Sequence, residues 1–269
     1  MKSGSAQADF QVVKDEQILG FRITGVGGDD LVARIIERLD GGGEPLFLAC
    51  ANPHSLVEAG RHAASREALE SADYLIPDGV GIVMASRILG GRIRERLTGA
   101  DAFLGLSRAL GRSGEHRCFF LGSDDSTLER IARTFKVDFP RLVVAGALAP
   151  PHKDDFSPDD DRLMVDAINS ASADILWVGM TALKQEKWVC RNRACLNVRF
   201  IGAIGAVFDF YAGTKRRSPE WALKRGLEWL PRLLREPHRL WRRTFVSAPV
   251  FLWLVLRERF GRPRADRNG

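Results

Sequence analysis

The 269-residue sequence lacks any apolar run as long as the roughly 18 to 20 residues of a membrane-spanning helix. Its N-terminal segment, MKSGSAQADF, also lacks the apolar stretch that a signal peptide carries. Low-complexity tracts and internal repeats are absent, and hydrophobic residues make up 45% of the chain, as in globular proteins. We therefore expect a globular protein of the cytoplasm that does not cross a membrane.

Cysteine pairs and nucleotide-cofactor motifs are missing as well. The spacing of the four cysteines matches neither a CxxC pair nor a zinc site. Cys50 and Cys118 lie in apolar runs, where a reduced thiol acts as a small core side chain. No GxGxxG turn with a trailing acidic residue follows the first strand, which argues against a dinucleotide cofactor.

The net charge of +6 is distributed unevenly along the chain. Residues 1–213 contain 25 Lys and Arg against 29 Asp and Glu, a balance of −4. Residues 214–269 contain 15 Lys and Arg against 5 Asp and Glu, a balance of +10. We therefore expect an anionic ligand or surface to bind to the basic C-terminal segment.

Short apolar runs alternate with amphipathic segments over most of the chain. Six runs are typical of buried strands, at residues 45–51, 74–76, 117–122, 142–145, 174–179 and 198–202. Helical patterns separate them, and polar or glycine-rich turns follow several of their ends. This order predicts an α/β fold with a doubly wound, mostly parallel, Rossmann-like sheet. We assign residues 1–213 to this catalytic domain and residues 214–269 to a basic helical appendage.

Residues 72–101 contain a polar turn that is central to the predicted site. An apolar run ends just before Asp78, and a helical pattern occupies residues 82–89. Gly79 and Gly81 lie between them and would let backbone N–H groups approach a ligand. Ligands of open α/β sheets bind at the carboxyl ends of the strands, so Asp78 is predicted to lie at the mouth of a site. An Asp at this position also caps helices, and the turn alone leaves both roles open.

Asn52 is a second polar residue at the carboxyl end of a predicted strand, that of residues 45–51. A helix cap and a ligand contact are both open for its side chain. His54, two residues later, is expected to be an exposed residue in the first turn of a helix rather than a catalyst.

Six sequence strings follow one another between about residues 45 and 243. They are ANPHSLVEA, ADYLIPDGVGIVMASR, RLTGAD, VGMTALKQEKWV, GAIGAVFDFYAG and RSPEWALKRGLEWLPRLLREPHRLWRR. Together they resemble the WecG/TagA/CpsF family of bacterial glycosyltransferases, glycosyltransferase family 26. The resemblance implies an inverting enzyme that transfers a sugar, typically N-acetylmannosamine or its uronic acid, from UDP to a polyprenyl-linked glycan at the cytoplasmic membrane face. Family members serve several surface-polysaccharide pathways, including wall teichoic acid and exopolysaccharide synthesis.

The resemblance also implies roles for single residues. Asp78 matches the residue proposed as the catalytic base, and Asn52 matches a polar residue near the donor sugar. Cys50 stands where some members have Thr, so a hydroxyl contact is not expected there. Positions that line the donor pocket match Arg96, Gln185 and Asp209, and basic positions thought to close over the diphosphate match Arg232, Arg239 and Arg242. With Gly79, these residues form the predicted substrate-binding set.

The chemistry of inverting transfer agrees with these residue types. A single displacement needs one base for the acceptor hydroxyl, and a lone carboxylate suffices. The leaving UDP carries negative charge, which arginines can stabilise. The run Asp159-Asp160-Asp161 contains the DxD spacing of metal-dependent glycosyltransferases, but it begins a predicted helix, where we favour capping. We therefore expect no metal and no cofactor besides the UDP-sugar substrate.

The C-terminal segment combines amphipathic and basic character. Residues 219–234 have an apolar face that includes Trp221, and residues 245–256 form an apolar run that includes Trp253. Basic residues beside such a helix suit the surface of a membrane, although a helical pair packed onto the domain would show the same pattern. Nucleic-acid binding is a third interpretation, disfavoured because no nucleic-acid module is recognisable. We expect a peripheral protein of the inner membrane face, and a homo-oligomer remains open.

Two other classes of function are compatible with parts of the sequence. Another nucleotide-sugar enzyme, such as an epimerase, would interconvert UDP-sugars without an acceptor. A non-enzymatic membrane- or nucleic-acid-binding module would act through the C-terminal segment alone and would leave Asp78 inert. Neither alternative explains why a carboxylate, an amide and arginines are predicted at one edge of the sheet.

Overall fold

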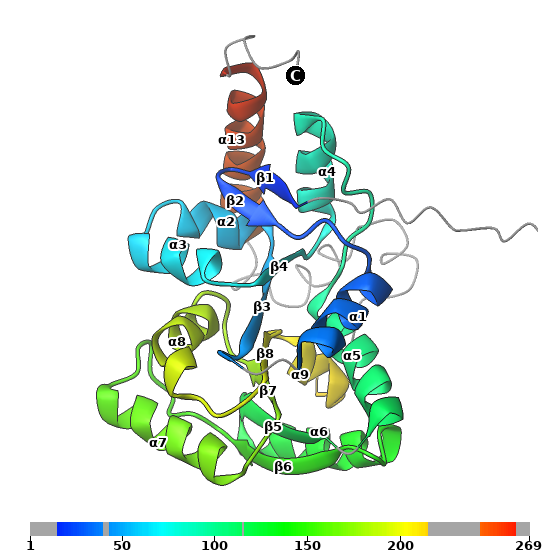
Figure 1. Ribbon diagram of the computed structural model, residues 1–269. Coiled ribbons are helices and arrows are strands. Elements are labelled where there is room, and N and C mark those ends of the chain that lie inside the picture. Colours follow the sequence, from blue (N-terminus) through cyan, green and yellow to red (C-terminus); the bar gives the residue numbers. More distant parts are fainter. Residues whose placement is uncertain (1–14, 40–42, 115, 215–242, 262–269) are drawn as a thin grey trace, which may run out of the picture.

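The computed structural model describes residues 15–39, 43–114, 116–214 and 243–261 (Figure 1). A six-stranded sheet with the strand order β4-β3-β8-β7-β5-β6 forms its centre, and all neighbouring strands are parallel. The strands are β3 (Leu46–Ala51), β4 (Tyr74–Pro77), β5 (Arg117–Gly122), β6 (Val143–Leu148), β7 (Ile175–Gly179) and β8 (Phe200–Ala203). The predicted doubly wound parallel sheet is thus confirmed.

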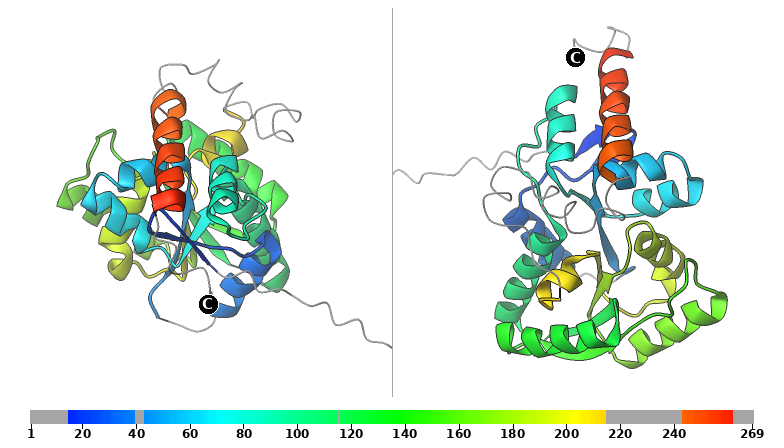
Figure 2. Two further views of the ribbon diagram at one scale, coloured as in Figure 1. Left: turned by 90° about the horizontal axis from the view of Figure 1, so that it is seen from above. Right: turned by 180° about the vertical axis from the view of Figure 1, so that it is seen from behind.

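Helices cover both faces of the sheet and form two hydrophobic cores (Figure 2). One core receives α1 (Gly28–Leu39), α5 (Gly99–Ser113), α6 (Asp125–Asp138) and α9 (Val207–Tyr211). The other receives α2 (Pro53–Ala59), α3 (Ala63–Glu70), α4 (Val80–Leu89), α7 (Pro158–Ser170) and α8 (Lys184–Asn192). A hairpin of β1 (Glu16–Ile18) and β2 (Phe21–Ile23) packs into this second core, and a short 3₁₀ helix η1 (Arg193–Cys195) follows α8.

Strand β3 shows why the central strands are continuous apolar runs. All six of its residues are buried, and successive side chains point to opposite faces of the sheet. Phe47 and Ala49 belong to one core, whereas Leu48 and Cys50 belong to the other. A strand covered by helices on both faces has no position for a polar side chain, so polar residues follow the strands rather than lie within them.

The last described elements are a π-helical turn η2 (Arg243–Ser247) and α13 (Ala248–Gly261), which packs against α2 and α4. Phe251 and Val255 of α13 are buried in the core. Ser247 Oγ lies 2.9 Å from His54 Nδ1, so the prediction that His54 is exposed is wrong: it is half-buried beneath this turn. The part of the appendage between residues 215 and 242, which includes the predicted amphipathic helix of residues 219–234, lies outside the described residues.

Candidate active site

Asn52 and Asp78 leave neighbouring strands at the same level of the sheet. Ala51 of β3 is paired with Pro77 of β4 in the parallel register. The backbone N–H of Asp78 then donates a 2.8 Å hydrogen bond to the carbonyl of Ala51. The prediction that these two polar residues meet at the carboxyl edge is therefore confirmed, because parallel pairing brings the strand ends together.

The two positions after Asp78 that are occupied by glycine, Gly79 and Gly81, require glycine for different structural reasons. Gly79 has a φ of +104° and is the N-cap of α4, with no side-chain capping bond. Asp78 is therefore not the capping residue of this helix. No atom lies within 4 Å of a Cβ built on Gly79, so the space beside its backbone is open. A Cβ on Gly81 would lie 2.4 Å from Cγ of Pro53, and this glycine allows the starts of α2 and α4 to pack closely.

Asn52 is buried and caps α2. Its Oδ1 accepts the backbone N–H of Ser55 at 3.1 Å, and Ser55 Oγ accepts the backbone N–H of Asn52 at 2.9 Å. Of the two roles left open for Asn52, the helix cap is therefore confirmed. The bond from Ser55 uses the carbonyl end of the carboxamide, and the Nδ2 end takes no part in the cap.

Cys50 is buried near the end of β3, with two carboxylates in its neighbourhood. Burial of its thiol raises its pKa well above the usual value, and the nearby charges of Asp78 and Glu186 raise it further. The thiol therefore stays neutral. A Cβ on Gly99 would lie 3.2 Å from Cys50 Sγ and 3.2 Å from Cβ of Ile204. The start of α5 consequently covers the ends of β3 and β8.

Arg96 belongs to the segment that enters α5. The next residue, Leu97, donates its backbone N–H to the carbonyl of Pro77 at 3.0 Å. Thr98 caps α5 in a capping box with Asp101. The half-buried Arg96 is therefore held beside the strand end that carries Asp78.

Gln185 ties the ends of β7 and β8 to the start of α8. Its Oε1 accepts the backbone N–H groups of Met180 at 3.2 Å and of Gly205 at 3.1 Å. Its Nε2 donates to Glu186 Oε1 at 2.9 Å. The helix begins at Lys184, because residues 180–183 form the turn that these side chains bind.

Glu186 is the one site residue for which the sequence suggested no role. Its carboxylate is 1% exposed and accepts hydrogen bonds from Gln185 Nε2 and from the backbone N–H of Leu183. Burial raises the pKa of Glu186 to about 7, although these hydrogen bonds oppose the shift. A capping box is the signal that could have identified it, but the N-cap is Leu183 with a φ of +67° instead of Ser or Thr.

Asp209 lies on α9, just after the glycine turn that follows β8. The neighbouring Phe208 packs against the end of β7, because a Cβ on Gly179 would lie 2.3 Å from its ring. This contact holds α9 at the same edge as the residues above, with Asp209 half-buried. The predicted diphosphate ligands Arg232, Arg239 and Arg242 lie outside the described residues.

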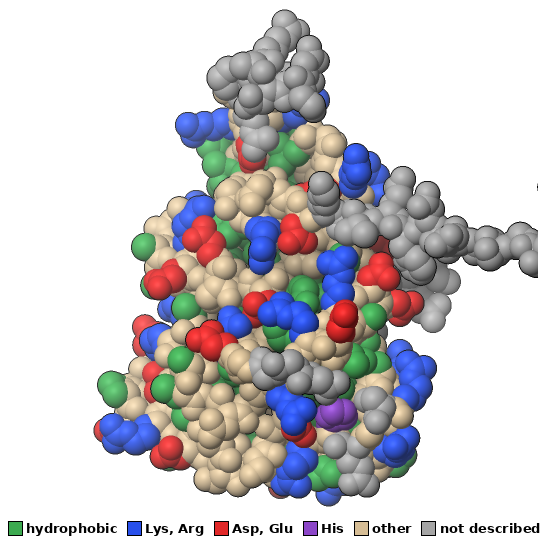
Figure 3. Space-filling view, viewed as in Figure 1, with side chains coloured by type: hydrophobic (Ala, Val, Ile, Leu, Met, Phe, Trp, Pro, Cys, Tyr) green, Lys and Arg blue, Asp and Glu red, His purple; other side chains and the backbone are tan. Residues whose placement is uncertain are grey.

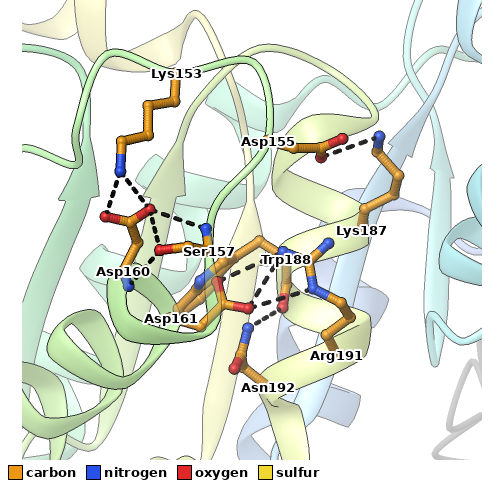
Figure 4. Close-up of polar contacts among 9 residues, drawn as sticks. All are labelled: Lys153, Asp155, Ser157, Asp160, Asp161, Lys187, Trp188, Arg191 and Asn192. Atoms are coloured by element: carbon orange, nitrogen blue, oxygen red, sulfur yellow. Dashed lines mark hydrogen bonds and ion pairs between the residues drawn. The ribbon is translucent and has the colours of Figure 1, made fainter.

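The acidic run at the start of α7 caps the helix, as predicted, and also forms ion pairs (Figure 4). Asp160 Oδ2 accepts the backbone N–H of Ser157 at 2.9 Å and lies 2.8 Å from Lys153 Nζ. The hydrogen bond from Lys153 lowers the pKa of Asp160 to about 2. Asp161 pairs with Arg191 at 3.3 Å. Across the described parts of the chain, no group of three or more His, Cys, Asp or Glu side chains is arranged to hold a metal ion.

Comparison with known proteins identifies a family and several relatives that the sequence of this chain resembles. The sequence model of the glycosyl transferase WecG/TagA/CpsF family matches residues 16–265. A relative from Bacillus spizizenii, named N-acetylglucosaminyldiphosphoundecaprenol N-acetyl-beta-D-mannosaminyltransferase, is 30% identical over 211 residues, which cover 78% of this chain and 79% of the relative. Proteins of the same name from Bacillus subtilis and Staphylococcus aureus are 27% and 26% identical, with the same coverage of both chains.

Proposed function

Because the chain belongs to the WecG/TagA/CpsF family of glycosyltransferases, we propose that it transfers N-acetylmannosamine from a UDP-sugar to a polyprenyl-diphosphate-linked N-acetylglucosamine. The names of the relatives from Bacillus and Staphylococcus support this donor sugar and this lipid-linked acceptor. One observation carries the proposal for the site: Asp78 stands beside Asn52 at the carboxyl edge, next to an open glycine turn. The product serves the synthesis of a bacterial surface polysaccharide.

The reaction is a single displacement with inversion at the sugar. Asp78 takes the proton of the acceptor hydroxyl while its oxygen attacks the anomeric carbon. The bond from that carbon to the diphosphate breaks, and UDP leaves with the electron pair. Nucleotide sugars of this kind carry the α configuration, and the relatives are named for a beta-mannosaminyl product, which supports inversion. No covalent nucleophile is needed.

The remaining predicted residues serve the donor. Asn52 offers its Nδ2 to the sugar, and the open backbone at Gly79 lies where a ligand can approach. Arg96, Gln185 and Asp209 line the donor pocket. Arg232, Arg239 and Arg242 of the appendage offset the charge of the diphosphate and close the site against water, which would otherwise hydrolyse the donor. The body of residues 1–213 and the appendage of residues 214–269 thus act together.

Helix α13 supports the proposal that this enzyme works at a membrane surface. The helix has two apolar faces, of which Phe251 and Val255 occupy the buried one. The opposite face carries Leu252, Trp253, Leu256 and Phe260, with exposed fractions of 43%, 58%, 38% and 79%. The body already covers the first face, so the second face is available to lipid. In the described ranges no helix is both long and apolar enough to cross a bilayer.

Basic side chains stand next to this outward face. Arg257 and Arg259 flank it on the helix, and the guanidinium of Arg257 lies 5.5 Å from the centre of the Trp253 ring. Figure 3 shows apolar and basic side chains together at the end of the molecule where α13 projects. Apolar insertion flanked by arginines suits the headgroup region of an anionic membrane, where the lipid-linked acceptor resides.

A UDP-release assay tests this function. Purified protein is given a panel of UDP-sugars, with and without a polyprenyl-diphosphate-linked N-acetylglucosamine acceptor. Release of UDP that requires the acceptor and occurs with UDP-N-acetylmannosamine is the expected result. Interconversion of UDP-sugars without an acceptor would support an epimerase instead. No release with any donor, from a protein that still binds vesicles, would contradict transferase activity and support a binding module.

A further inference from the structure

The side chains of Gln185 and Glu186 form a buried chain of hydrogen bonds beneath the site. Two backbone N–H groups, from Met180 and Gly205, donate to Gln185 Oε1. Gln185 Nε2 donates to Glu186 Oε1, and the N–H of Leu183 donates to Glu186 Oε2. The chain therefore joins the turn after β7, the turn after β8 and the first turn of α8.

This arrangement fixes which way the Gln185 carboxamide points. Its oxygen already accepts two backbone N–H groups, so both lone pairs are in use. The reverse orientation would place an NH₂ group against those two donors and leave both backbone N–H groups without an acceptor. Gln185 can consequently offer a ligand only an N–H of Nε2, and it acts toward the donor as a hydrogen-bond donor.

Glu186 is what keeps Nε2 in this orientation, and capping alone does not account for its burial. Asp160 has the same position in the capping box of α7, yet it remains in contact with water and pairs with Lys153. Glu186 is 1% exposed, and its charge and that of Asp78 both act on the Cys50 thiol. Enclosing a carboxylate is costly, and such a cost is typical of functional sites.

We propose that Glu186 is a positioning residue of the donor pocket, which holds the Gln185 carboxamide so that its oxygen closes the two turns and its N–H faces the donor. The inference rests on the proposed function for the identity of the donor. Glu186 itself touches neither the donor nor the reacting atoms. Its effect on donor binding passes through Gln185.

A double-mutant cycle on donor affinity tests this role. Affinity for UDP-N-acetylmannosamine is measured by calorimetry without acceptor for the wild type, Glu186→Gln, Gln185→Ala and the double variant. In Glu186→Gln a single amide oxygen replaces the two carboxylate oxygens as acceptor, so one buried hydrogen bond is lost. We therefore expect about tenfold weaker donor binding, the usual cost of one unsatisfied buried hydrogen bond. Gln185→Ala should lose about as much, and the double variant should bind no more weakly than Gln185→Ala. Losses that multiply in the double variant would overturn the positioning role.

A matched control separates positioning from helix capping. Asp160→Asn makes the same chemical change at the same position of a capping box, away from the chain of hydrogen bonds, and should leave donor affinity unchanged. Hydrogen exchange gives a readout that needs no ligand: the Met180 and Gly205 amides should exchange faster in Glu186→Gln, although Gln185 is still present. Unchanged exchange at both amides would also contradict the proposal.

Two further outcomes are distinguishable. If Glu186→Gln does not fold, Glu186→Asp replaces it, because Asp keeps the charge and withdraws the carboxylate by one methylene; unchanged donor affinity in that variant would overturn the proposal. A wild-type protein that binds the donor but transfers nothing to the acceptor would contradict the proposed function and not the role of Glu186. A wild-type protein that does not bind the donor would overturn both.

Discussion

Asp160 on α7 and Glu186 on α8 are each the third residue of a helix and each accept the backbone N–H of the N-cap residue, but in different surroundings. Asp160 is hydrogen-bonded by Lys153 and Ser157, which lower its pKa to about 2. Glu186 is enclosed, and burial raises its pKa to about 7. The local motif alone therefore does not determine the state of the carboxylate. The surroundings do, and the buried carboxylate is the one that lies beside the candidate active site.

The same contrast separates two acidic groups of the molecule. The run of Asp159, Asp160 and Asp161 is conspicuous in the sequence, yet Asp160 caps α7 and pairs with Lys153, and Asp161 pairs with Arg191 (Figure 4). Asp159 pairs with Arg162 at 3.5 Å. Asp78 and Glu186 are far apart in the sequence, and the fold brings both next to Cys50. We propose that this second pair serves the reaction, Asp78 as the base and Glu186 through Gln185.

The largest effect is expected at Asp78. Asp78→Asn removes the base but keeps the shape of the side chain, so turnover should fall by a factor on the order of 10² to 10⁴. Donor affinity should remain, because the amide leaves the pocket filled. The matched control is Asp161→Asn in the acidic run, with unchanged turnover expected. Equal turnover of Asp78→Asn and wild type in a steady-state transfer assay would rule out Asp78 as the base.

The pH dependence of stability should distinguish the two capping carboxylates. The pKa of Glu186 is about 7 in the folded protein against an ordinary value of 4.5, so the folded state holds a proton that the unfolded state has released. This contribution is fully present below the unfolded pKa and is lost as pH rises through about 7. As the pH rises from 4.5 to above 7, the free energy of unfolding of the wild type relative to Glu186→Gln should decrease by an amount on the order of 3 kcal/mol. Denaturant titrations at several pH values measure it.

Asp160 should show the opposite sign. Its folded pKa is lowered from 3.8 to about 2, so its contribution is present above the unfolded pKa and is lost as pH falls through the folded pKa. Asp160→Asn should therefore lower stability by a constant amount across the neutral region and remove part of the acid limb of the profile. A difference between Asp160→Asn and wild type that varies with pH across the neutral region, as the difference for Glu186→Gln should, would contradict the distinction between the two sites.

A smaller effect is expected on the outward face of α13. Trp253→Ala should weaken binding to vesicles of phosphatidylglycerol and phosphatidylcholine about tenfold, because the exposed indole no longer inserts. Point substitution is preferable to truncation, since Phe251 and Val255 of the same helix complete the core. Leu163→Ala on α7, another exposed apolar residue, is the control. An equal loss from both variants in a sedimentation assay would show that α13 is not the contact.

The smallest effect is expected from the acidic run itself. Asp160→Asn removes the bond to Lys153 and part of the cap of α7, so the melting temperature should decrease while the transfer rate stays at the wild-type value. Thermal unfolding followed by circular dichroism and a parallel transfer assay measure both. A lost transfer rate with an unchanged melting temperature would indicate that the run has a role in catalysis after all.

The sequence predicted the parts of this arrangement that depend on local pattern. The run from Arg117 to Gly122 became β5 with the same bounds, and parallel pairing of two apolar runs placed Asn52 and Asp78 together. Contacts between distant segments could not be predicted in this way. His54 meets Ser247 across 193 positions of the chain.

The role of Glu186 could not be predicted for a related reason. The N-cap residue whose backbone N–H it accepts is Leu183, a residue type that gives no capping signal, in a left-handed conformation that Leu rarely adopts. Its burial depends on strands and turns that are contributed by other parts of the chain. Burial of a charged side chain is a property of the assembled fold, so the spacing of residues alone does not reveal it.

The most direct test of the catalytic site is the anomeric configuration of the product. The wild type is given UDP-N-acetylmannosamine and the polyprenyl-diphosphate-linked acceptor, and the new linkage is assigned by NMR from its one-bond carbon–hydrogen coupling. A single displacement with Asp78 as base gives the β linkage from the α-linked donor. An α-linked product would mean retention, which requires a different mechanism, and would contradict the role assigned to Asp78.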